Sequence, residues 1–134
     1  MKRLIYSSIA SDKVTFSIIG DLLTQAVRKN KENSITGMMV YDGHHFIQCI
    51  EGDETVIDDL YQKIKEDSRH HSLHINGEEA DENRLFSSWN MGYMNNEKEI
   101  KKMIKSVTGH ETLTHEILSY PHAKLILLQL SFII

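Results

Sequence analysis

The stretch Ser34–Gly52, SITGMMVYDGHHFIQCIEG, decides the fold of this chain. Two apolar runs rich in β-branched and aromatic residues, Ile35–Tyr41 and His45–Glu51, flank the pair Asp42-Gly43. Asp-Gly between such runs is a strong signal for a β-hairpin, because a type I′ turn needs positive φ at both central residues and this pair tolerates it. We therefore predict a hairpin that turns at Asp42-Gly43.

The second strand of this hairpin places an amide among apolar side chains. Phe46, Gln48 and Ile50 share one face because successive side chains of a strand point to opposite sides. We expect that face to be buried, and an unpaired buried polar group costs about 1–3 kcal/mol. From the hairpin alone, Gln48 fits two interpretations, a structural glutamine bonded to the backbone and a glutamine that meets a ligand.

Hydrophobic periodicity on either side of the hairpin predicts the element order β-α-β-β-α-β-β. This order is typical of an α+β, ferredoxin-like βαββαββ sheet with two helices on one face, and here we expect C-terminal helices in addition. The first and third strands are central neighbours in that topology, so Tyr6 and Gln48 can touch. The expected strands are residues 4–9, 35–41, 45–51, 71–75 and 85–93, the helices are 15–31 and 53–67, and the acidic stretch 78–83 is expected to be a solvated loop.

The pattern after residue 95 is helical, so we predict a domain over 1–95 and a helical C-terminal extension over 96–134. Ile100, Met103, Ile104 and Val107 lie at helical spacing and suit a helix that covers the second face of the sheet. A short helix over 111–119 is expected to stop at Tyr120-Pro121. Residues 125–134 are too apolar to remain in water, and they fit either the core or an interface with another protein.

Composition narrows the class of protein. A chain of 134 residues is long enough for one domain with a real core. The net charge of −4 argues against a nucleic-acid partner, and no apolar run reaches the ~20 residues of a membrane span. The single cysteine, Cys49, excludes an internal disulfide, and the absence of room for a signal peptide before the first strand leads us to expect a cytoplasmic protein.

Several short motifs together resemble the BLUF family, which comprises blue-light sensors that bind FAD non-covalently. Each motif is weak alone, but the set is specific and covers residues 2–94 in the order of the family. The matching segments are RLIYSS at 3–8, RKN at 28–30, ITG at 35–37, FIQCIEG at 46–52, DSRH at 67–70 and WNMG at 89–92.

The resemblance implies a photoactive group of four residues. Tyr6 corresponds to the tyrosine that donates an electron and a proton, and Gln48 to the glutamine between that tyrosine and the N5/O4 edge of the flavin. Trp89 and Met91 correspond to the pair whose exchange near the glutamine is discussed as part of signalling. In such a photoreceptor, light-driven transfer from Tyr6 rearranges the hydrogen bonds of Gln48. The C-terminal helices then carry the signal to a partner protein or an oligomer interface.

The resemblance also implies a set of cofactor-binding residues. Asn30 corresponds to the asparagine that bonds the edge of the ring system, and Leu22 and Ile64 to apolar side chains on its two faces. Lys29 departs from the family, in which a smaller polar residue or a histidine is common. The full expected set is Tyr6, Leu22, Arg28, Lys29, Asn30, Gln48, Ile64, Asp67, Arg69 and His70.

Other interpretations fit parts of this pattern. Tyr6, Trp89 and Met91 would be core residues in any such fold, and basic residues at 28–31 suit the end of a helix. The eight histidines lack the spacing of metal ligands, so we predict no metal site. An acylphosphatase-type enzyme lacks its anion-binding loop here, because residues 7–12 contain neither glycine nor arginine. The main alternative is a flavin-free ferredoxin-like regulatory or oligomerisation module, and in either case we expect no enzyme.

Overall fold

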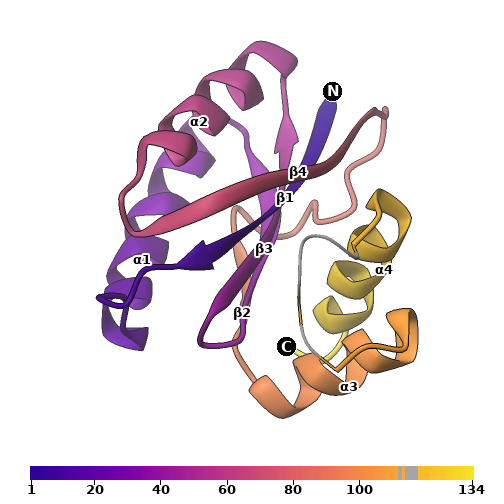
Figure 1. Ribbon diagram of the computed structural model, residues 1–134. Helices are drawn as coiled ribbons and strands as arrows, with labels where there is room; N and C mark the ends of the chain where they lie inside the picture. Colours follow the sequence, from indigo (N-terminus) through magenta and orange to yellow (C-terminus); the bar gives the residue numbers. More distant parts are fainter. Residues whose placement is uncertain (112, 114–117) are drawn as a thin grey trace.

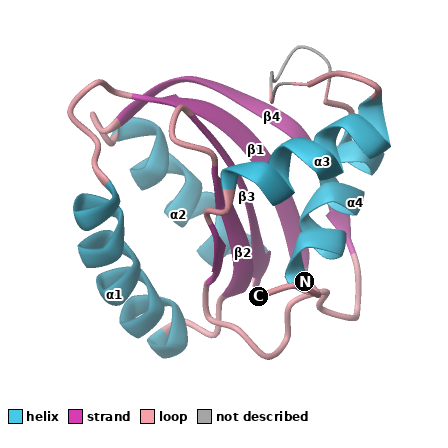
Figure 2. Ribbon diagram, turned by 90° about the horizontal axis from the view of Figure 1, so that it is seen from below, coloured by secondary structure: helices cyan, strands magenta, loops and turns pink. Residues whose placement is uncertain are grey.

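The computed structural model describes residues 1–111, 113 and 118–134. The helix expected over 111–119 falls mainly on residues 112 and 114–117, which lie outside the described residues. One five-stranded sheet runs through the molecule, with α1 and α2 on one face and α3 and α4 on the other (Figure 1). Figure 2 shows the sheet between the two helix pairs. The helices are α1 (Phe16–Glu32), α2 (Glu54–Glu66), α3 (Glu97–Thr108) and α4 (Tyr120–Ser131).

The sheet has the strand order β4-β1-β3-β2-β5. β1 is antiparallel to both β3 and β4, and β2 is antiparallel to β3 and parallel to β5. The predicted ferredoxin-like arrangement is therefore confirmed, with the first and third strands as central neighbours. The strands are β1 (Lys2–Ala10), β2 (Thr36–Tyr41), β3 (His45–Gly52), β4 (His70–Ala80) and β5 (Gly92–Met94).

The hairpin of β2 and β3 is confirmed, but its turn is shifted by one residue. Asp42 pairs with His45 through its backbone N–H, so the central residues of the turn are Gly43 and His44. Only Gly43 has positive φ, at 102°, so the turn is not of type I′. The Asp42 carboxylate accepts hydrogen bonds from the backbone N–H groups of His44 and His45, which stabilises this alternative turn.

The last two strands differ from their predicted bounds, because these bounds depend on contacts with side chains of strands that are distant in the sequence. Residues 78–80 belong to β4 rather than to a loop, since Glu78 forms an ion pair with Lys2 on β1 and Glu79 with Arg3. Residues 85–91 are not a strand, because the backbone N–H groups of Leu85 and Phe86 bond to the Glu51 carboxylate instead of a neighbouring strand. Only Gly92–Met94 pairs with β2, as β5.

Tyr120 and Pro121 begin α4, a helix whose bounds were not predicted from the sequence. Ser119 is the N-cap, and its hydroxyl accepts a hydrogen bond from the backbone N–H of His122. Proline is tolerated in the first turn, where its missing N–H would have no partner within the helix.

The two faces of the sheet belong to two separate cores. On β3, Phe46 and Ile50 pack with α1 and α2, whereas Ile47 and Cys49 pack with α3 and α4, as the predicted alternation requires. Ile100 and Ile104 of α3 are buried in this second core, in agreement with the role expected for that helix. No helix among the residues that the structure describes is both long and apolar enough to cross a membrane.

The apolar stretch 125–134 was expected to lie either in the core or at an interface, and its two parts differ in burial. Ile126, Leu127 and Leu130 of α4 are fully buried in the second core. Phe132, Ile133 and Ile134, which follow α4, are exposed at 76%, 50% and 53%. The helix thus completes the fold, whereas these three residues, which we call the C-terminal patch, remain available for contact with another protein.

The substitution Ile104→Ala should destabilise the protein by about 2–4 kcal/mol, because it opens a cavity in the second core. The measurement is the free energy of unfolding in denaturant. Lys102→Ala, on the exposed side of the same helix, is the matched control and should change stability by no more than about 0.5 kcal/mol. Equal stability of the two variants would show that α3 does not share this core.

Candidate functional site

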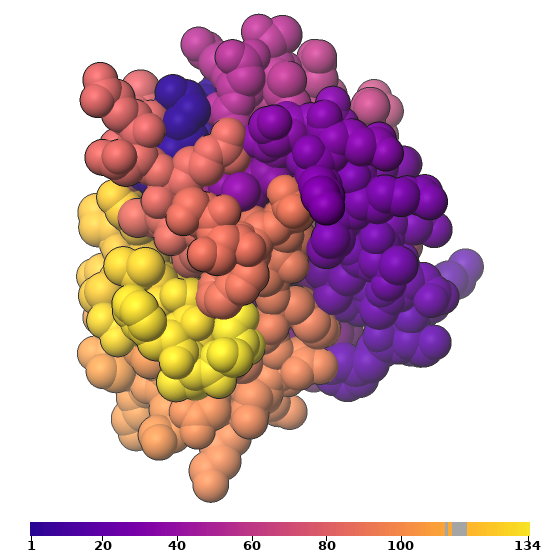
Figure 3. Space-filling model, turned by 180° about the vertical axis from the view of Figure 1, so that it is seen from behind, coloured from indigo at the N-terminus to yellow at the C-terminus, as the bar shows by residue number. Residues whose placement is uncertain are grey.

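A cavity of about 430 Å³ lies between α1 and α2 over the central strands of the sheet. Its floor is formed by Tyr6 on β1, Gln48 and Phe46 on β3, and Met39 on β2. Its volume falls in the range of about 300–1,000 Å³ that is usual for small-molecule sites. The space-filling view in Figure 3 shows the segment that follows β4 packed against α1, on the side of the molecule opposite to that of Figure 1.

Tyr6 and Gln48 face each other across the β1–β3 pairing and form a buried hydrogen bond. The Tyr6 hydroxyl donates to Oε1 of Gln48, and Nε2 of Gln48 donates to Sδ of Met91 at 3.3 Å. The thioether is a weak acceptor, so the amide keeps donor capacity toward the cavity. The predicted contact between Tyr6 and Gln48 is thus present, and Met91 completes the group.

Burial raises the pKa of the Tyr6 phenol far above its ordinary value, and the neighbouring Tyr61 and Asp67 add to this rise. The Tyr61 and His70 rings each pack edge-to-face with the Tyr6 ring, with centroid distances of 5.7 Å and 6.2 Å. Tyr6 is therefore a neutral phenol at physiological pH, and it remains a hydrogen-bond donor to the amide.

Asn30 is buried in the last turn of α1 and is held by the segment that carries Met91. Its Nδ2 donates to the backbone oxygen of Asn90 at 2.8 Å, and the Asn90 side chain donates in turn to Ile35 O at 3.0 Å. Oδ1 of Asn30 accepts no hydrogen bond from the part of the chain that the structure describes. This oxygen is an acceptor on the wall of the cavity.

Asp67, Arg69 and His70 also line the cavity and form a polar rim. Asp67 forms an ion pair with Arg69, and the hydrogen bonds from Arg69 hold the pKa of the Asp67 carboxyl below its usual range. His70 donates from Nε2 to Ile64 O at 2.6 Å, because a carbonyl oxygen can only accept. Nδ1 of His70 is hydrogen-bonded to the Ser8 hydroxyl at 2.8 Å.

The walls of the cavity are apolar side chains of the two helices. Leu22 of α1 and Ile64 of α2 both line it, as the resemblance implied. Only Ile19 and Asn30 are fully buried on α1, because much of its apolar face borders the cavity instead of a packed core. This leaves a slot with apolar sides and a polar floor.

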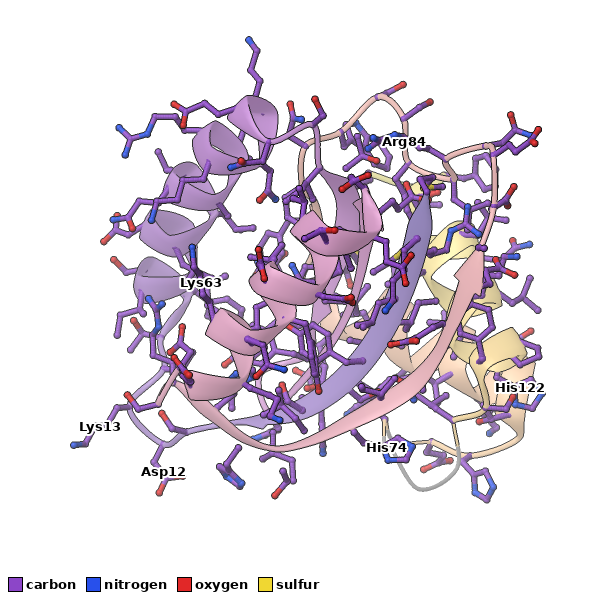
Figure 4. The ribbon with its side chains drawn as sticks, turned by 90° about the horizontal axis from the view of Figure 1, so that it is seen from above. Asp12, Lys13, Lys63, His74, Arg84 and His122 are labelled. Atoms are coloured by element: carbon purple, nitrogen blue, oxygen red, sulfur yellow. The ribbon has the colours of Figure 1, made fainter. Side chains whose placement is uncertain are left out.

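Sequence reasoning missed several residues of the slot. Lys63 extends from α2 toward α1 (Figure 4) and lines the cavity together with Lys29 and Arg69. Helical spacing could have found it, since positions three and four before Asp67 lie on the same face of α2. The other missed lining residues include Val14, Ile18, Leu23, Ala26, Val56 and Leu60.

Arg28 and Trp89 do not reach the cavity. Arg28 is exposed on α1, one residue away from the face that borders the slot. The Trp89 ring stacks on Phe86 at 6.5 Å and packs into the second core, against Gly92. Met91 is therefore the member of the Trp89–Met91 pair that contacts Gln48.

The family model described as sensors of blue light using FAD matches residues 1–92. The chain belongs to the BLUF family. Its sequence is 33% identical over 73 residues to the blue light- and temperature-regulated antirepressor BluF of Escherichia coli, a match over 54% of this chain. It is 28% identical over 93 residues, 68% of this chain, to the photoactivated adenylate cyclase subunit alpha of Euglena gracilis. These matches span 18% and 9% of the two relatives' own lengths.

Solved structures of BLUF proteins share the whole fold. The ground-state structure of BlsA has a TM-score of 0.86 at 28% identity, over 96% of this chain and 86% of that one. The dark-state structure of the BLUF protein BlrB has a TM-score of 0.77 at 25% identity, over 97% and 93%. The BLUF family comprises sensors, in agreement with the expectation that this chain is not an enzyme; cyclase activity is named for the longer Euglena proteins.

The residues of the cavity fit the FAD that this BLUF family uses. The flat ring system of a flavin needs a slot with apolar faces and polar groups at one edge, and α1, α2 and the floor residues supply these. Oδ1 of Asn30 and the amide of Gln48 offer an acceptor and a donor to the ring edge. Lys29, Lys63 and Arg69 supply positive charge for the phosphates.

The described residues contain no group of three or more His, Cys, Asp or Glu placed to hold a metal ion. His45 lies beside Asp42, and His70 is bonded to Ser8 and Ile64, so both rings serve the local structure.

The buried Tyr6 phenol should make the BLUF chain less stable above about pH 10, where a tyrosine of the unfolded chain loses its proton. The folded protein keeps that proton, so the unfolded state binds fewer protons and stability falls as pH rises. The parent should lose about 1.4 kcal/mol more than Tyr6→Phe between about pH 9 and about pH 11, measured by denaturant unfolding. An identical pH dependence of the two proteins would show that Tyr6 is not shielded from deprotonation.

Proposed function

We propose that this chain detects blue light through Tyr6 and Gln48, with FAD held in the cavity between α1 and α2. The observation that carries the proposal is the buried hydrogen bond from the Tyr6 hydroxyl to Gln48 Oε1 on the floor of that cavity. A structural glutamine would have its donors paired with the backbone. Gln48 instead has Met91 Sδ as the acceptor of its amide, which leaves this amide free to bond a ligand.

Bound FAD would supply a ring that absorbs blue light and becomes a strong oxidant when excited. Tyr6 is the electron donor, and its phenolic proton moves along the existing hydrogen bond to Gln48 Oε1. With FAD bound, Gln48 would rotate or tautomerise and pass this proton to the ring that has accepted the electron, and both would then return from the ring to Tyr6. The changed hydrogen bonds of Gln48 outlast this return, and one such bond is worth about 1 kcal/mol, which is enough to bias a bistable segment.

The other predicted residues of the cavity bind the cofactor rather than react. Leu22 and Ile64 cover the two faces of the ring, and Asn30 bonds its edge. Asp67, Arg69 and His70 form the rim beside the side chain of the flavin, where Lys29 and Lys63 face its phosphates. Arg28 and Trp89 have no part in this binding, because neither lines the cavity.

Tyr6→Phe and Gln48→Leu should each retain FAD and lose the reversible red shift that blue light produces in the parent. Each substitution removes one end of the Tyr6–Gln48 hydrogen bond and leaves the walls of the slot intact. The measurement is the absorption spectrum of the purified protein, reconstituted with FAD, in the dark and after illumination. A parent protein that takes up no FAD would contradict the proposal, as would a variant with the normal shift.

The substitution Asn30→Ala should affect the binding of FAD but not the photochemistry, in contrast to Tyr6→Phe and Gln48→Leu. It removes the Asn30 amide from the cavity wall and leaves the Tyr6–Gln48 bond in place. This variant should lose FAD on dilution several-fold more readily than the parent, and the fraction that stays bound should still show the red shift.

We further propose that the signal leaves through α3 and α4, and that the C-terminal patch of Phe132, Ile133 and Ile134 binds a second copy of the chain. Large exposed apolar side chains in a cluster mark protein interfaces more often than free surface. One relative is named an antirepressor and another a photoactivated adenylate cyclase subunit, so a partner protein is the alternative recipient of the signal. The buried, unpaired Cys49 is compatible with a reducing cytoplasm, and we propose neither a nucleic acid nor a membrane as partner.

The double substitution Phe132→Ser with Ile134→Ser should abolish any light-dependent change in molecular size and preserve the red shift. Both residues are exposed, so the fold should lose no more than about 0.5 kcal/mol for each substitution. Light scattering in the dark and under blue light is the measurement. A change in size that persists in the double variant would place the interface elsewhere.

A further inference from the structure

Glu51 is a fully buried carboxylate that the light-sensing group does not use. It lies on β3 three residues after Gln48, with its side chain on the opposite face of the sheet. Its two oxygens accept four hydrogen bonds, which come from Arg3 Nε at 2.9 Å, Thr36 Oγ1 at 3.0 Å, Leu85 N at 2.8 Å and Phe86 N at 2.9 Å.

Two of these four bonds fix the start of the segment that ends at Met91. The Arg84 guanidinium adds a bond to the backbone oxygen of Glu51 at 3.1 Å. Farther along, the oxygen of Trp89 accepts from Gly37 N at 3.1 Å, and Asn90 is tied to Asn30. Met91 follows directly and contacts Gln48 through its sulfur. The 84–91 segment is thus hydrogen-bonded to Glu51 near its start and to Asn30 and Gln48 at its end.

A carboxylate suits this place better than an amide. All four partners of the Glu51 side chain are donors, and an ionised carboxylate is an acceptor with two oxygens. A glutamine would turn an NH₂ group toward at least one N–H donor. The Arg3 guanidinium balances the charge and continues to Glu79, Asp81 and the backbone oxygen of Asn83.

We propose that Glu51 is a positioning residue for the light-sensing group: by holding the backbone at 85–86 it sets the place of Met91 against Gln48. This role extends the proposed function. The predicted effect on the decay of the lit state rests on that function. Loss of the carboxylate releases the start of the segment, so Met91 Sδ withdraws from Gln48 Nε2. Gln48 then reorients more readily, and the lit state of the FAD-loaded protein decays to the dark state several-fold faster.

The test compares Glu51→Gln with the parent by NMR of protein labelled at the methionine methyl groups. The parent should show a nuclear Overhauser contact between the Met91 methyl group and the side-chain amide protons of Gln48, and the variant should lose it. Glu79→Gln is the matched control, because Glu79 also accepts a hydrogen bond from Arg3 but has its other hydrogen bond with Lys124 of α4 instead of the 84–91 segment. The control should keep the contact and the dark recovery rate of the parent.

Thr36→Val keeps the test decisive if Glu51→Gln does not fold. It removes one donor to Glu51 and an acceptor of Arg84 with little change in shape, and should shift the Met91 methyl signal in the same direction by a smaller amount. A folded Glu51→Gln or Thr36→Val protein with unchanged Met91 signals would overturn the assignment. The NMR comparison needs no bound FAD, so it remains valid even if the parent shows no response to light and the proposed function fails.

Discussion

The antiparallel pairing of β1 with β3 aligns two polar pairs, one on each face of the sheet. Tyr6 stands opposite Gln48 on the cavity side, and Arg3 stands opposite Glu51 on the other side. A slip of one residue would turn each of these side chains to the wrong face and leave four buried polar groups without their partners. The same register therefore brings Tyr6 and Gln48 together and specifies how β1 and β3 pair.

The two pairs differ in their electrostatic character, and each suits its surroundings. The Tyr6–Gln48 hydrogen bond joins two neutral side chains on the floor of the cavity that must admit the ring system of FAD. A buried charge at this place would be costly to desolvate. The Arg3–Glu51 pair is charged, and its cost is offset because nearly every donor and acceptor around it is used. It also ties β1, β3 and β4 to the segment after β4, and Glu79 extends the network to Lys124 of α4.

Short-range patterns were enough to predict the parts of this molecule that depend on periodicity. Alternation on β3 and the order of the elements predicted that Tyr6 and Gln48 meet, and helical spacing assigned Ile104 to the second core. The outcome for residues 78–91 depended instead on contacts with Lys2, Arg3 and Glu51, which lie more than thirty residues away in the chain. No local signal in the acidic stretch or around Trp89 carries that information. Arg28 was predicted to bind the cofactor but does not line the cavity, since one residue along a helix turns a side chain by about 100°.

The alternation of β3 between two cores has an evolutionary consequence. Neighbouring residues such as Gln48 and Cys49 lie in different environments, so a substitution that repacks α3 and α4 leaves the walls of the flavin slot unchanged. Under the proposed function, the surface that passes on the signal can therefore change in sequence while the cavity for the flavin stays the same. Relatives within one family can exchange their output surfaces while they retain the same photochemistry.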